Sequence, residues 1–229
     1  MRQLILDTET TGLDPERGHK IIEFAALEMI DRKLTGNYLH LYINPEREIE
    51  EEASRIHGIT NADVQDKPTF AMVVKDIIDF IKDSQLIIHN AKFDIGFMDF
   101  QFRQENFGIT NEYVSGVIDT LAIARRKYSG SKNTLDALCD RFKVDRSSRK
   151  YHGALVDCEL LAEVYLHLTR EQISLLDSDE QTSGNGITRY KLDRVSNGAP
   201  LKIIKASPLE LQNHEQYLAN CDNLINGKW

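Results

Sequence analysis

Two carboxylates lie close together near the beginning of the chain, at Asp7 and Glu9. They follow the mostly apolar run of residues 2–6, which predicts a short buried strand that ends on Asp7. Because side chains alternate along an extended segment, Asp7 and Glu9 point to the same side. Neighbouring carboxylates repel each other unless a cation neutralises them, and hard divalent ions such as Mg²⁺ bind oxygen ligands of this kind. The pair alone fits a metal site and two solvated acids at a strand end equally well.

A third carboxylate, Asp94, stands where the apolar run of residues 86–89 gives way to a helical pattern. The run predicts a compact strand. We expect Phe93 and Phe97 to anchor the turn between the two elements in the core and to aim Asp94 outward. The alternative is an acid in the first helical turn that stabilises the helix dipole and does no chemistry.

Asp157 and His152 lie at the beginning of the last amphipathic helix, which is predicted for residues 154–168. Five residues correspond to about 140° around an ideal helix, so the two side chains do not share one helical face. We therefore expect His152 just before the helix or on its first turn, where Gly153 gives it local freedom. The alternatives are an exposed loop histidine and another acid that stabilises a helix dipole.

These four carboxylates and one histidine fall at element ends that a mixed sheet brings to one edge. Their composition is that of a two-metal phosphodiesterase site, in which one ion activates water and the other stabilises the leaving oxygen. A histidine that titrates near neutral pH takes the proton from the attacking water. Together the residues favour this chemistry over the separate structural explanations.

The elements that must position these side chains indicate an α/β fold. Two strand-like runs, residues 20–31 and 34–44, are joined by a short segment and predict a β-hairpin. Apolar residues at helical spacing predict a helix over residues 70–81. Asp119 and Asn133 are expected to cap two further helices. Strands come first and then alternate with helices, which is typical of a mixed β-sheet flanked by helices.

The character of the sequence changes after the last predicted helix. Residues 177–186 contain nothing apolar and predict a flexible linker. A short strand is expected at residues 201–204, and a helix at Ser207, with proline at its first position and Glu210 placed for a capping box. The predicted parts are a catalytic domain at residues 1–170, a linker at 171–189 and a tail at 190–229 that folds against a partner.

Composition adds limits on function. Hydrophobic residues make up 41% of the 229 residues, enough for a buried core, and the formal net charge is −8. That charge argues mildly against a protein that holds nucleic acid unaided, because such binding depends on Lys and Arg at the phosphates. The three cysteines show neither disulfide nor zinc spacing, which is typical of a reducing cytoplasm. The apolar run at the N-terminus is too short for a signal peptide or a membrane span, so no membrane contact is expected.

Five motifs follow one another along the first three quarters of the chain: LDTETTG at residues 6–12, RIHGI at 55–59, HNAKFDIGFM at 89–98, NTLDALC at 133–139 and HGALVD at 152–157. In this order they resemble the DEDDh family of 3′→5′ exonucleases, in particular the proofreading subunits of bacterial DNA polymerase III. The resemblance implies a ribonuclease H-like mixed β-sheet flanked by helices. It also implies a DNA exonuclease that uses two divalent metal ions, Mg²⁺ or Mn²⁺, and releases nucleoside 5′-monophosphates.

The resemblance implies a role for each candidate side chain of the site. Asp7 would bridge both ions, and Glu9 and Asp157 would hold the ion that carries the nucleophilic water. Asp94 would help to hold the second ion, and His152 would be the general base. The sequence shows no departure from the family pattern at these positions.

The resemblance also implies contacts to the terminal nucleotide. They would come from Thr10, Glu52, His57 and Phe93. A planar histidine side chain can stack on a frayed base or form a hydrogen bond with it. The alternative for His57 is a histidine of the core with satisfied hydrogen bonds.

Gln172, Leu175 and Leu176, within residues 172–176, resemble the short peptide by which replication proteins bind the sliding clamp. Leu176 stands where many such peptides carry Phe, and the alternative is a helix end packed on the domain. The tail at residues 190–229 resembles, more loosely, the segment that binds the alpha subunit of DNA polymerase III. Whether a small theta-like subunit also binds is left open.

Two other functions compete with a proofreading exonuclease. A stand-alone enzyme that trims RNA or DNA 3′ ends would keep the fold, but the linker and tail argue against it. A non-catalytic scaffold between polymerase and clamp would need no active site, and the complete catalytic set argues against that as the sole role.

Overall fold

The structure is a computed structural model, which describes residues 1–147, 151–170 and 207–214. The chain divides into two units, Met1–Ile173 and Ser174–Trp229, and each is described by itself. Within the described residues, no helix is long and apolar enough to cross a membrane.

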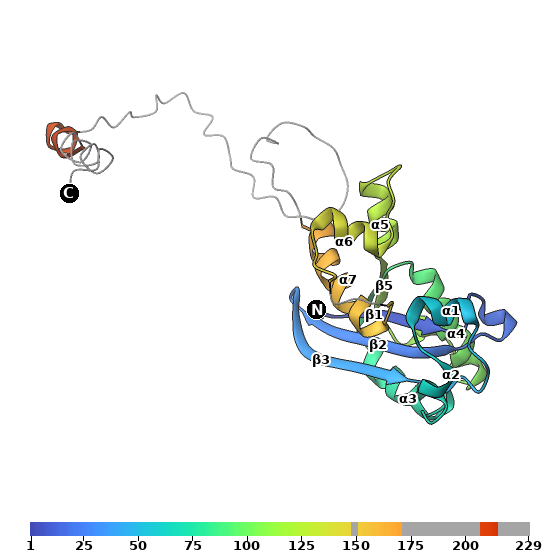
Figure 1. Cartoon of the computed structure of the whole chain (residues 1–229). Helices are drawn as coiled ribbons and strands as arrows, with labels where there is room; N and C mark the ends of the chain where they lie inside the picture. The colour runs from blue at the N-terminus through green and yellow to red at the C-terminus, as the bar shows by residue number, and fades with distance from the viewer. Residues whose placement is uncertain (148–150, 171–206, 215–229) are drawn as a thin grey trace. The chain divides into compact units, whose positions relative to one another are not determined.

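The first unit is built on a five-stranded sheet with the order β3-β2-β1-β4-β5 (Figure 1). The three strands β1 to β3 pair antiparallel, whereas β4 and β5 join β1 in parallel. This confirms the predicted mixed sheet. The strands are β1 (Arg2–Thr10), β2 (Ile21–Ile30), β3 (Lys33–Tyr42), β4 (Gln85–Ile88) and β5 (Gly116–Asp119).

Strand β1 continues beyond Asp7, so the prediction that it ends there is wrong. Its last residues still pair with β2, with Thr8 opposite Phe24 and Thr10 opposite Ile21. Both acids of the DTE segment therefore belong to the strand itself. Their orientation is fixed by the β1–β2 ladder rather than by a loop.

The predicted hairpin is confirmed between β2 and β3. Asp31 and Arg32 form its turn, with φ of 49° and 65°. Positive φ at both central residues is the geometry of a type I′ turn, whose twist matches that of the flanking strands.

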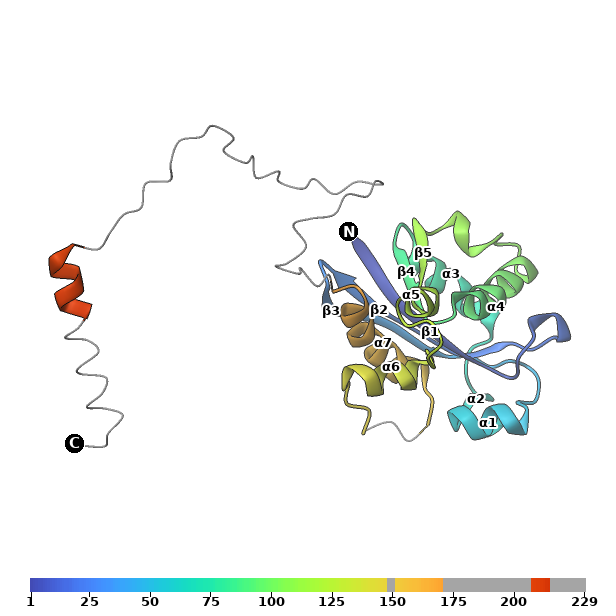
Figure 2. The same ribbon diagram turned by 90° about the horizontal axis from the view of Figure 1, so that it is seen from above.

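Helices cover both faces of the sheet, and Figure 1 shows α3 and α7 on opposite sides of it. Seen from above in Figure 2, α5 and α6 lie beside α7. Short helices α1 and α2, which the sequence patterns did not predict, connect β3 to α3. The helices are α1 (Glu51–His57), α2 (Asn61–Val64), α3 (Phe70–Ile81), α4 (Ala91–Gln104), α5 (Thr120–Lys127), α6 (Leu135–Phe142) and α7 (Ala154–Leu168), with 3₁₀ turns η1 (Pro15–Arg17) and η2 (Thr110–Glu112).

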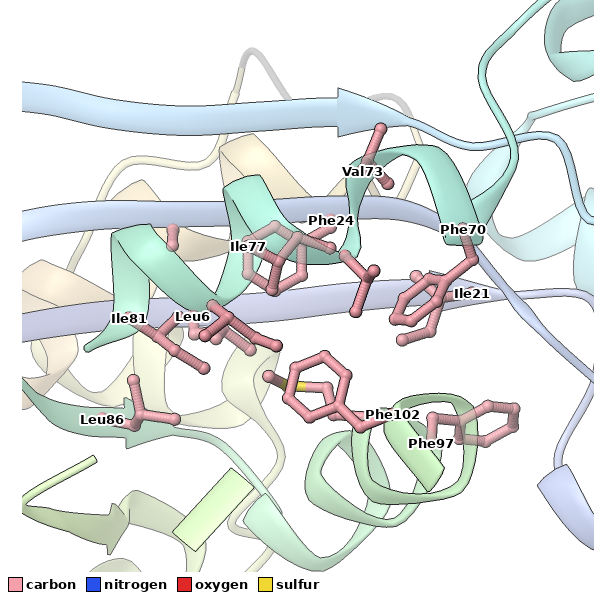
Figure 3. Packing of buried hydrophobic residues seen from close by; sticks show 14 of the residues in the cluster. Leu6, Ile21, Phe24, Phe70, Val73, Ile77, Ile81, Leu86, Phe97 and Phe102 are labelled. Atoms are coloured by element: carbon pink, nitrogen blue, oxygen red, sulfur yellow. The ribbon is translucent and has the colours of Figure 1, made fainter. Parts of the chain in front are cut away.

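One face of the sheet packs against α3 and α4 in a purely apolar core (Figure 3). Leu6 and Phe24 of the sheet meet Ile77 of α3 and Phe102 of α4, and all four are fully buried. Each such side chain stabilises the fold by about 1.5–3 kcal/mol through its burial. The apolar residues whose spacing predicts α3 are thus the ones that the helix buries against the sheet.

The opposite face packs against α7. Ile5 of β1 and Ala25 of β2 contact the buried residues Ala154, Cys158 and Leu161 of the helix. The small side chains allow a close approach, and the Cys158 Sγ lies 3.4 Å from the Ala25 carbonyl oxygen, to which it donates. Burial raises the pKa of the Cys158 thiol well above its usual value, so this cysteine is an inert core residue. The first turn of α7 is thereby held over the end of β1.

The two predicted helix caps have different outcomes. Asp119 caps α5, accepting hydrogen bonds from the Leu121 and Ala122 N–H groups. Asn133 does not cap α6. Thr134 does, because the Asn133 amide is occupied by carbonyls of the preceding loop and its oxygen by a guanidinium.

In the second unit the described residues 207–214 include a helical segment. The Glu210 N–H donates to Ser207 Oγ over 3.3 Å, and the Ser207 N–H donates to Glu210 Oε2 over 2.7 Å. This confirms the predicted capping box. The predicted linker, the strand at residues 201–204 and the peptide at residues 172–176 lie outside the described residues.

Candidate active site at the end of β1

Asp7 and Glu9 lie on the face of the sheet that α7 covers. In the β1–β2 ladder Asp7 is opposite Ala25 and Glu9 is opposite Glu23. Directly opposed residues share a face, and Ala25 belongs to the core beneath α7. Both acids are half-buried. The strand therefore presents two carboxylates toward the first turn of the helix.

Asp157 and His152 meet this pair from the beginning of α7. His152 precedes the N-cap residue Gly153, and Asp157 lies buried in the first turn. The His152 Nδ1 is 3.3 Å from Asp157 Oδ2. Glu9, His152 and Asp157 each present one possible ligand atom, and these atoms all lie within 4.8 Å of one another. Residues far apart in the sequence thus converge on one point.

Asp94 approaches the site from α4, on the other face of the sheet. Its side chain accepts from the Thr8 N–H over 3.1 Å and from the Thr8 hydroxyl over 2.7 Å. The expectation that it points outward is wrong, since Asp94 is only 3% exposed. Asn90, with φ of 70°, turns the chain sharply from β4 into α4 and lays the first turn of that helix against β1.

The carboxylates repel one another in this setting. Burial raises the pKa of Asp7 well above its usual value, and the charges of Asp94, Glu9 and Asp157 raise it further. Burial also raises the pKa of Asp94 to about 7, although its hydrogen bonds to Thr8 oppose the shift. A divalent cation would relieve this repulsion, and carboxylate oxygens are the ligands that hard divalent ions such as Mg²⁺ prefer. The residues present therefore fit such an ion.

A cleft of about 610 Å³ opens beside the carboxylates. Asp7, His152 and Asp157 line one wall, and the connection between α5 and α6 lines the other. Sequence reasoning assigned no role to Arg125, Ser129 and Ser131 of this lining, because no pattern marks them. His89, Asn90 and Asn133, which belong to the motifs at residues 89–98 and 133–139, line the cleft as well.

Comparison with known proteins decides the family. The sequence model of the exonuclease family matches residues 4–165. The DNA polymerase III subunit epsilon of Pasteurella multocida is 45% identical over 222 residues, covering 95% of this chain and 88% of that protein. The protein of the same name from Rickettsia felis is 46% identical, covering 96% of each chain. This chain belongs to the epsilon-subunit family of exonucleases.

Solved structures agree with this membership and with the predicted resemblance. Exonuclease X in complex with 5′ overhanging duplex DNA is 30% identical, with a TM-score of 0.57, and the match covers 72% of this chain and 90% of that one. The nuclease domain of the DEDDh member 3′hExo shares the fold, with a TM-score of 0.63 at 21% identity over 73% of this chain and 90% of that one. The ribonuclease H-like fold class is confirmed, and with it the dependence of the family on divalent metal ions.

The four residues expected at the terminal nucleotide of an epsilon-family enzyme lie around the end of β1. Thr10 is buried and donates its hydroxyl hydrogen to the Gly12 carbonyl over 2.6 Å. Glu52 is exposed on the first turn of α1. Phe93 is half-buried on the first turn of α4 and lines a second hollow of about 350 Å³.

His57, the fourth of these residues, is the last residue of α1. It is only 6% exposed, and its Nδ1 accepts from the Ile59 N–H over 3.0 Å. Burial lowers its pKa, and the Thr10 carbonyl opposes that shift. The Nε2 is buried and has no hydrogen-bond partner among the described residues, so His57 does not fit the alternative of a core histidine with all its hydrogen bonds satisfied. Contact between His57 and a nucleotide stays a prediction.

Helix α1 is tied to the segment that carries His152. The His152 N–H donates to the Ile56 carbonyl over 3.1 Å. Gly58 ends α1 with φ of 73°, and a Cβ atom there would lie 2.9 Å from the Tyr151 ring. Only glycine satisfies both the left-handed backbone and this close approach. Glu52 and His57 therefore lie on a helix that is hydrogen-bonded to the backbone of His152.

Proposed function

We propose that this chain removes nucleotides from the 3′ end of DNA and proofreads as a subunit of DNA polymerase III. The observation that carries the proposal is the convergence of Glu9, His152 and Asp157, whose ligand atoms lie within 4.8 Å of one another beside Asp7. A cluster of half-buried and buried acids next to a histidine serves phosphodiester hydrolysis well. The same cluster has no evident use in a scaffold.

The proposed site holds two divalent ions, Mg²⁺ or Mn²⁺, on Asp7, Glu9, Asp94 and Asp157. When bound, the ions would activate a nucleophilic water and stabilise the negative charge that develops on the phosphate and leaving oxygens. Asp94 is held in place by two hydrogen bonds from Thr8, so it meets the site in one fixed orientation.

His152 is proposed as the general base. Its Nδ1 faces the Asp157 carboxylate at 3.3 Å, which favours the tautomer with the hydrogen on Nδ1. The Nε2 is then the atom that accepts the proton from the attacking water. His152 is 45% exposed, so water can reach this atom.

The substrate is proposed to be a frayed 3′ end. We propose that Thr10, Glu52, His57 and Phe93 contact the terminal nucleoside. Unpairing a mismatched terminus costs less free energy than unpairing a matched one, so mispaired and single-stranded ends reach the site more readily.

The proposed partners are the alpha subunit of DNA polymerase III, a sliding clamp bound by Gln172, Leu175 and Leu176, and a small theta-like subunit. The names of the curated relatives and the match over 95% of this chain support the polymerase. A net charge of −8 suits a nuclease that is tethered to its DNA by a partner, where effective concentration replaces affinity. We place the protein in the cytoplasm, at the replisome.

Initial rates on duplexes with matched and mispaired 3′ termini, in Mg²⁺, test the proposal. We expect faster release from the mispaired terminus, and an increase when the polymerase alpha subunit is added. Faster degradation of the matched terminus would contradict proofreading. A preference for RNA over a DNA oligonucleotide of the same sequence would favour the end-trimming alternative.

A further inference from the structure

Glu23 is a buried carboxylate that the proposed chemistry does not use. It lies on β2, directly opposite Glu9 in the β1–β2 ladder, and is only 2% exposed. Like charges at directly opposed positions destabilise a sheet. An apolar side chain would avoid this repulsion, so the presence of an acid here calls for a reason other than packing.

The two oxygens of Glu23 bind two different elements. His40 of β3 places its Nε2 2.7 Å from Glu23 Oε1. The Ala154 N–H, at the first position of α7, donates to Glu23 Oε2 over 3.1 Å. The carboxylate therefore connects the outer strand of the sheet to the beginning of the helix that carries Asp157.

Helix α7 begins without a side-chain cap of its own. Its N-cap residue is Gly153, which has no side chain to accept a hydrogen bond from the first turn. A carboxylate near a helix N-terminus satisfies a free N–H group and interacts favourably with the helix dipole. Glu23 performs this task from a neighbouring strand. The N–H group that it binds lies between His152 and Asp157 in the sequence.

We propose that Glu23, held in place by His40, is a positioning residue of the active site. It fixes the first turn of α7 and thereby sets His152 and Asp157 against Glu9. The inference rests on the proposed nuclease function, and it assigns Glu23 no contact with substrate or metal. Its effect is on the rate of the bound complex rather than on substrate binding.

Glu23→Ala and Glu23→Gln in the full chain test this role. The substrate is the p-nitrophenyl ester of thymidine 5′-monophosphate, assayed with Mn²⁺. Glu23→Ala should lower kcat roughly tenfold to hundredfold, the usual effect of removing a partner that orients an active-site group, with KM nearly unchanged. Glu23→Gln keeps an acceptor for the Ala154 N–H and should recover most of kcat.

A second measurement is independent of activity. Hydrogen exchange of the Ala154 amide, followed by NMR without metal, should be faster in Glu23→Ala and close to wild type in Glu23→Gln. A Glu23→Ala protein that keeps kcat, or that keeps the Ala154 amide protected, would overturn the inference. So would a Glu23→Gln protein as impaired as Glu23→Ala.

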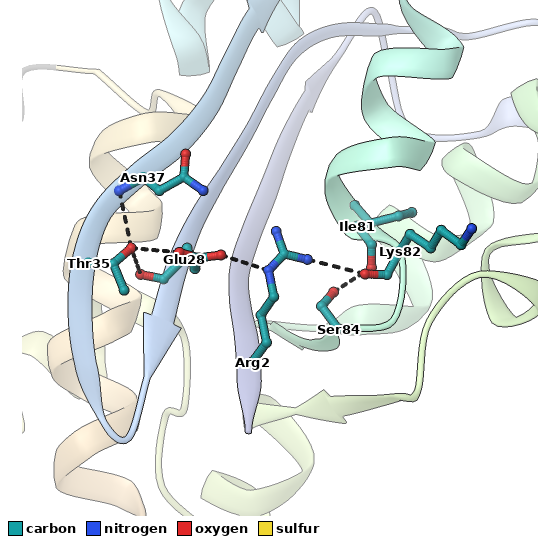
Figure 4. A network of polar contacts seen from close by, with 7 residues as sticks. All are labelled: Arg2, Glu28, Thr35, Asn37, Ile81, Lys82 and Ser84. Carbon is teal, nitrogen blue, oxygen red and sulfur yellow. Dashed lines mark hydrogen bonds and ion pairs between the residues drawn. The ribbon is translucent and has the colours of Figure 1, made fainter.

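Glu28 provides a matched control on the same strand. It is bound by Arg2 and Thr35 at the opposite end of β2 (Figure 4). Glu28→Ala should leave kcat and the exchange of the Ala154 amide unchanged, and an equal loss of kcat in both variants would overturn the inference.

His40→Ala keeps the inference testable if Glu23→Ala does not fold. The His40 side chain is 22% exposed, and its removal takes away the imidazole that binds Glu23 Oε1. We expect a smaller drop in kcat and faster exchange of the Ala154 amide, and wild-type values of both would overturn the inference. An inactive wild-type protein would instead count against the proposed function.

Discussion

The two ends of the β1–β2 ladder differ in whether their carboxylates are neutralised by other groups of the chain. At one end Arg2 donates to Glu28 over 2.7 Å, and hydrogen bonds from Arg2 and Thr35 lower the pKa of Glu28. At the other end burial and neighbouring acids raise the pKa of Asp7. The first end is neutralised within the chain. At the second end the carboxylates repel one another, and a bound cation would relieve that repulsion. A fold that is stable elsewhere can maintain such a reactive site.

Asp7→Ala should have the largest effect on nuclease activity. Removing the proposed bridging ligand should lower kcat/KM on a single-stranded DNA oligonucleotide by about 10³-fold or more. The free energy of unfolding of the metal-free protein should rise, because a repelled carboxylate is lost. Binding to the polymerase alpha subunit, measured by co-purification, should be unaffected. Retained nuclease activity would show that Asp7 is not part of the site.

His152→Ala should have the next largest effect. Loss of a general base lowers kcat by roughly 10²- to 10⁴-fold, with little change in thermal stability because the side chain is half exposed. His167→Ala, at the last turn of the same helix, is the matched control, because its ring stacks on Phe142 away from the carboxylates. Equal rates for the two variants would remove His152 from the mechanism.

Asp94 should make the stability of the metal-free protein depend on pH. Its pKa rises from 3.8 to about 7 on folding, chiefly through burial, so between these pH values the unfolded chain has lost a proton that the folded protein keeps. The free energy of unfolding of the metal-free protein therefore falls as pH rises from about 4 to about 7. Thermal melts in a chelator should show this fall in the wild type and a smaller one in Asp94→Asn. Parallel curves for the two proteins would contradict the assignment.

The smallest effect on stability and activity is expected at the end of the ladder that carries Arg2 and Glu28. Arg2→Ala removes an ion pair that is partly exposed to solvent, so the free energy of unfolding should fall by about 1 kcal/mol or less. Nuclease activity should stay at the wild-type rate, as measured on the same oligonucleotide. A large loss of activity would mean that the two ends of the ladder are not independent.

Much of this arrangement could be predicted from the sequence because its signals are local. The alternation of Asp7 and Glu9 along a strand, and the position of His152 just before α7, follow from chain geometry and agree with the structure. The burial of Asp94 could not be predicted, because it depends on the sharp turn at Asn90 and on hydrogen bonds from Thr8 of another element.

Glu23 is the clearest residue that sequence reasoning missed. It interrupts the otherwise apolar run of residues 21–27 in β2, and such an interruption is a signal in itself. Its partners His40 and Ala154 come from distant segments, so only the folded chain shows what it binds. The short helices α1 and α2 were missed for a different reason: they are too short to show a helical pattern.

Titration calorimetry with Mn²⁺ at pH 8 tests the central claim most directly, namely that the carboxylates at the end of β1 bind divalent cations. The wild type and Glu28→Gln should bind Mn²⁺ with the same affinity, whereas Asp7→Asn should bind it at least about tenfold more weakly. Equal affinity in Asp7→Asn and the wild type would contradict the account.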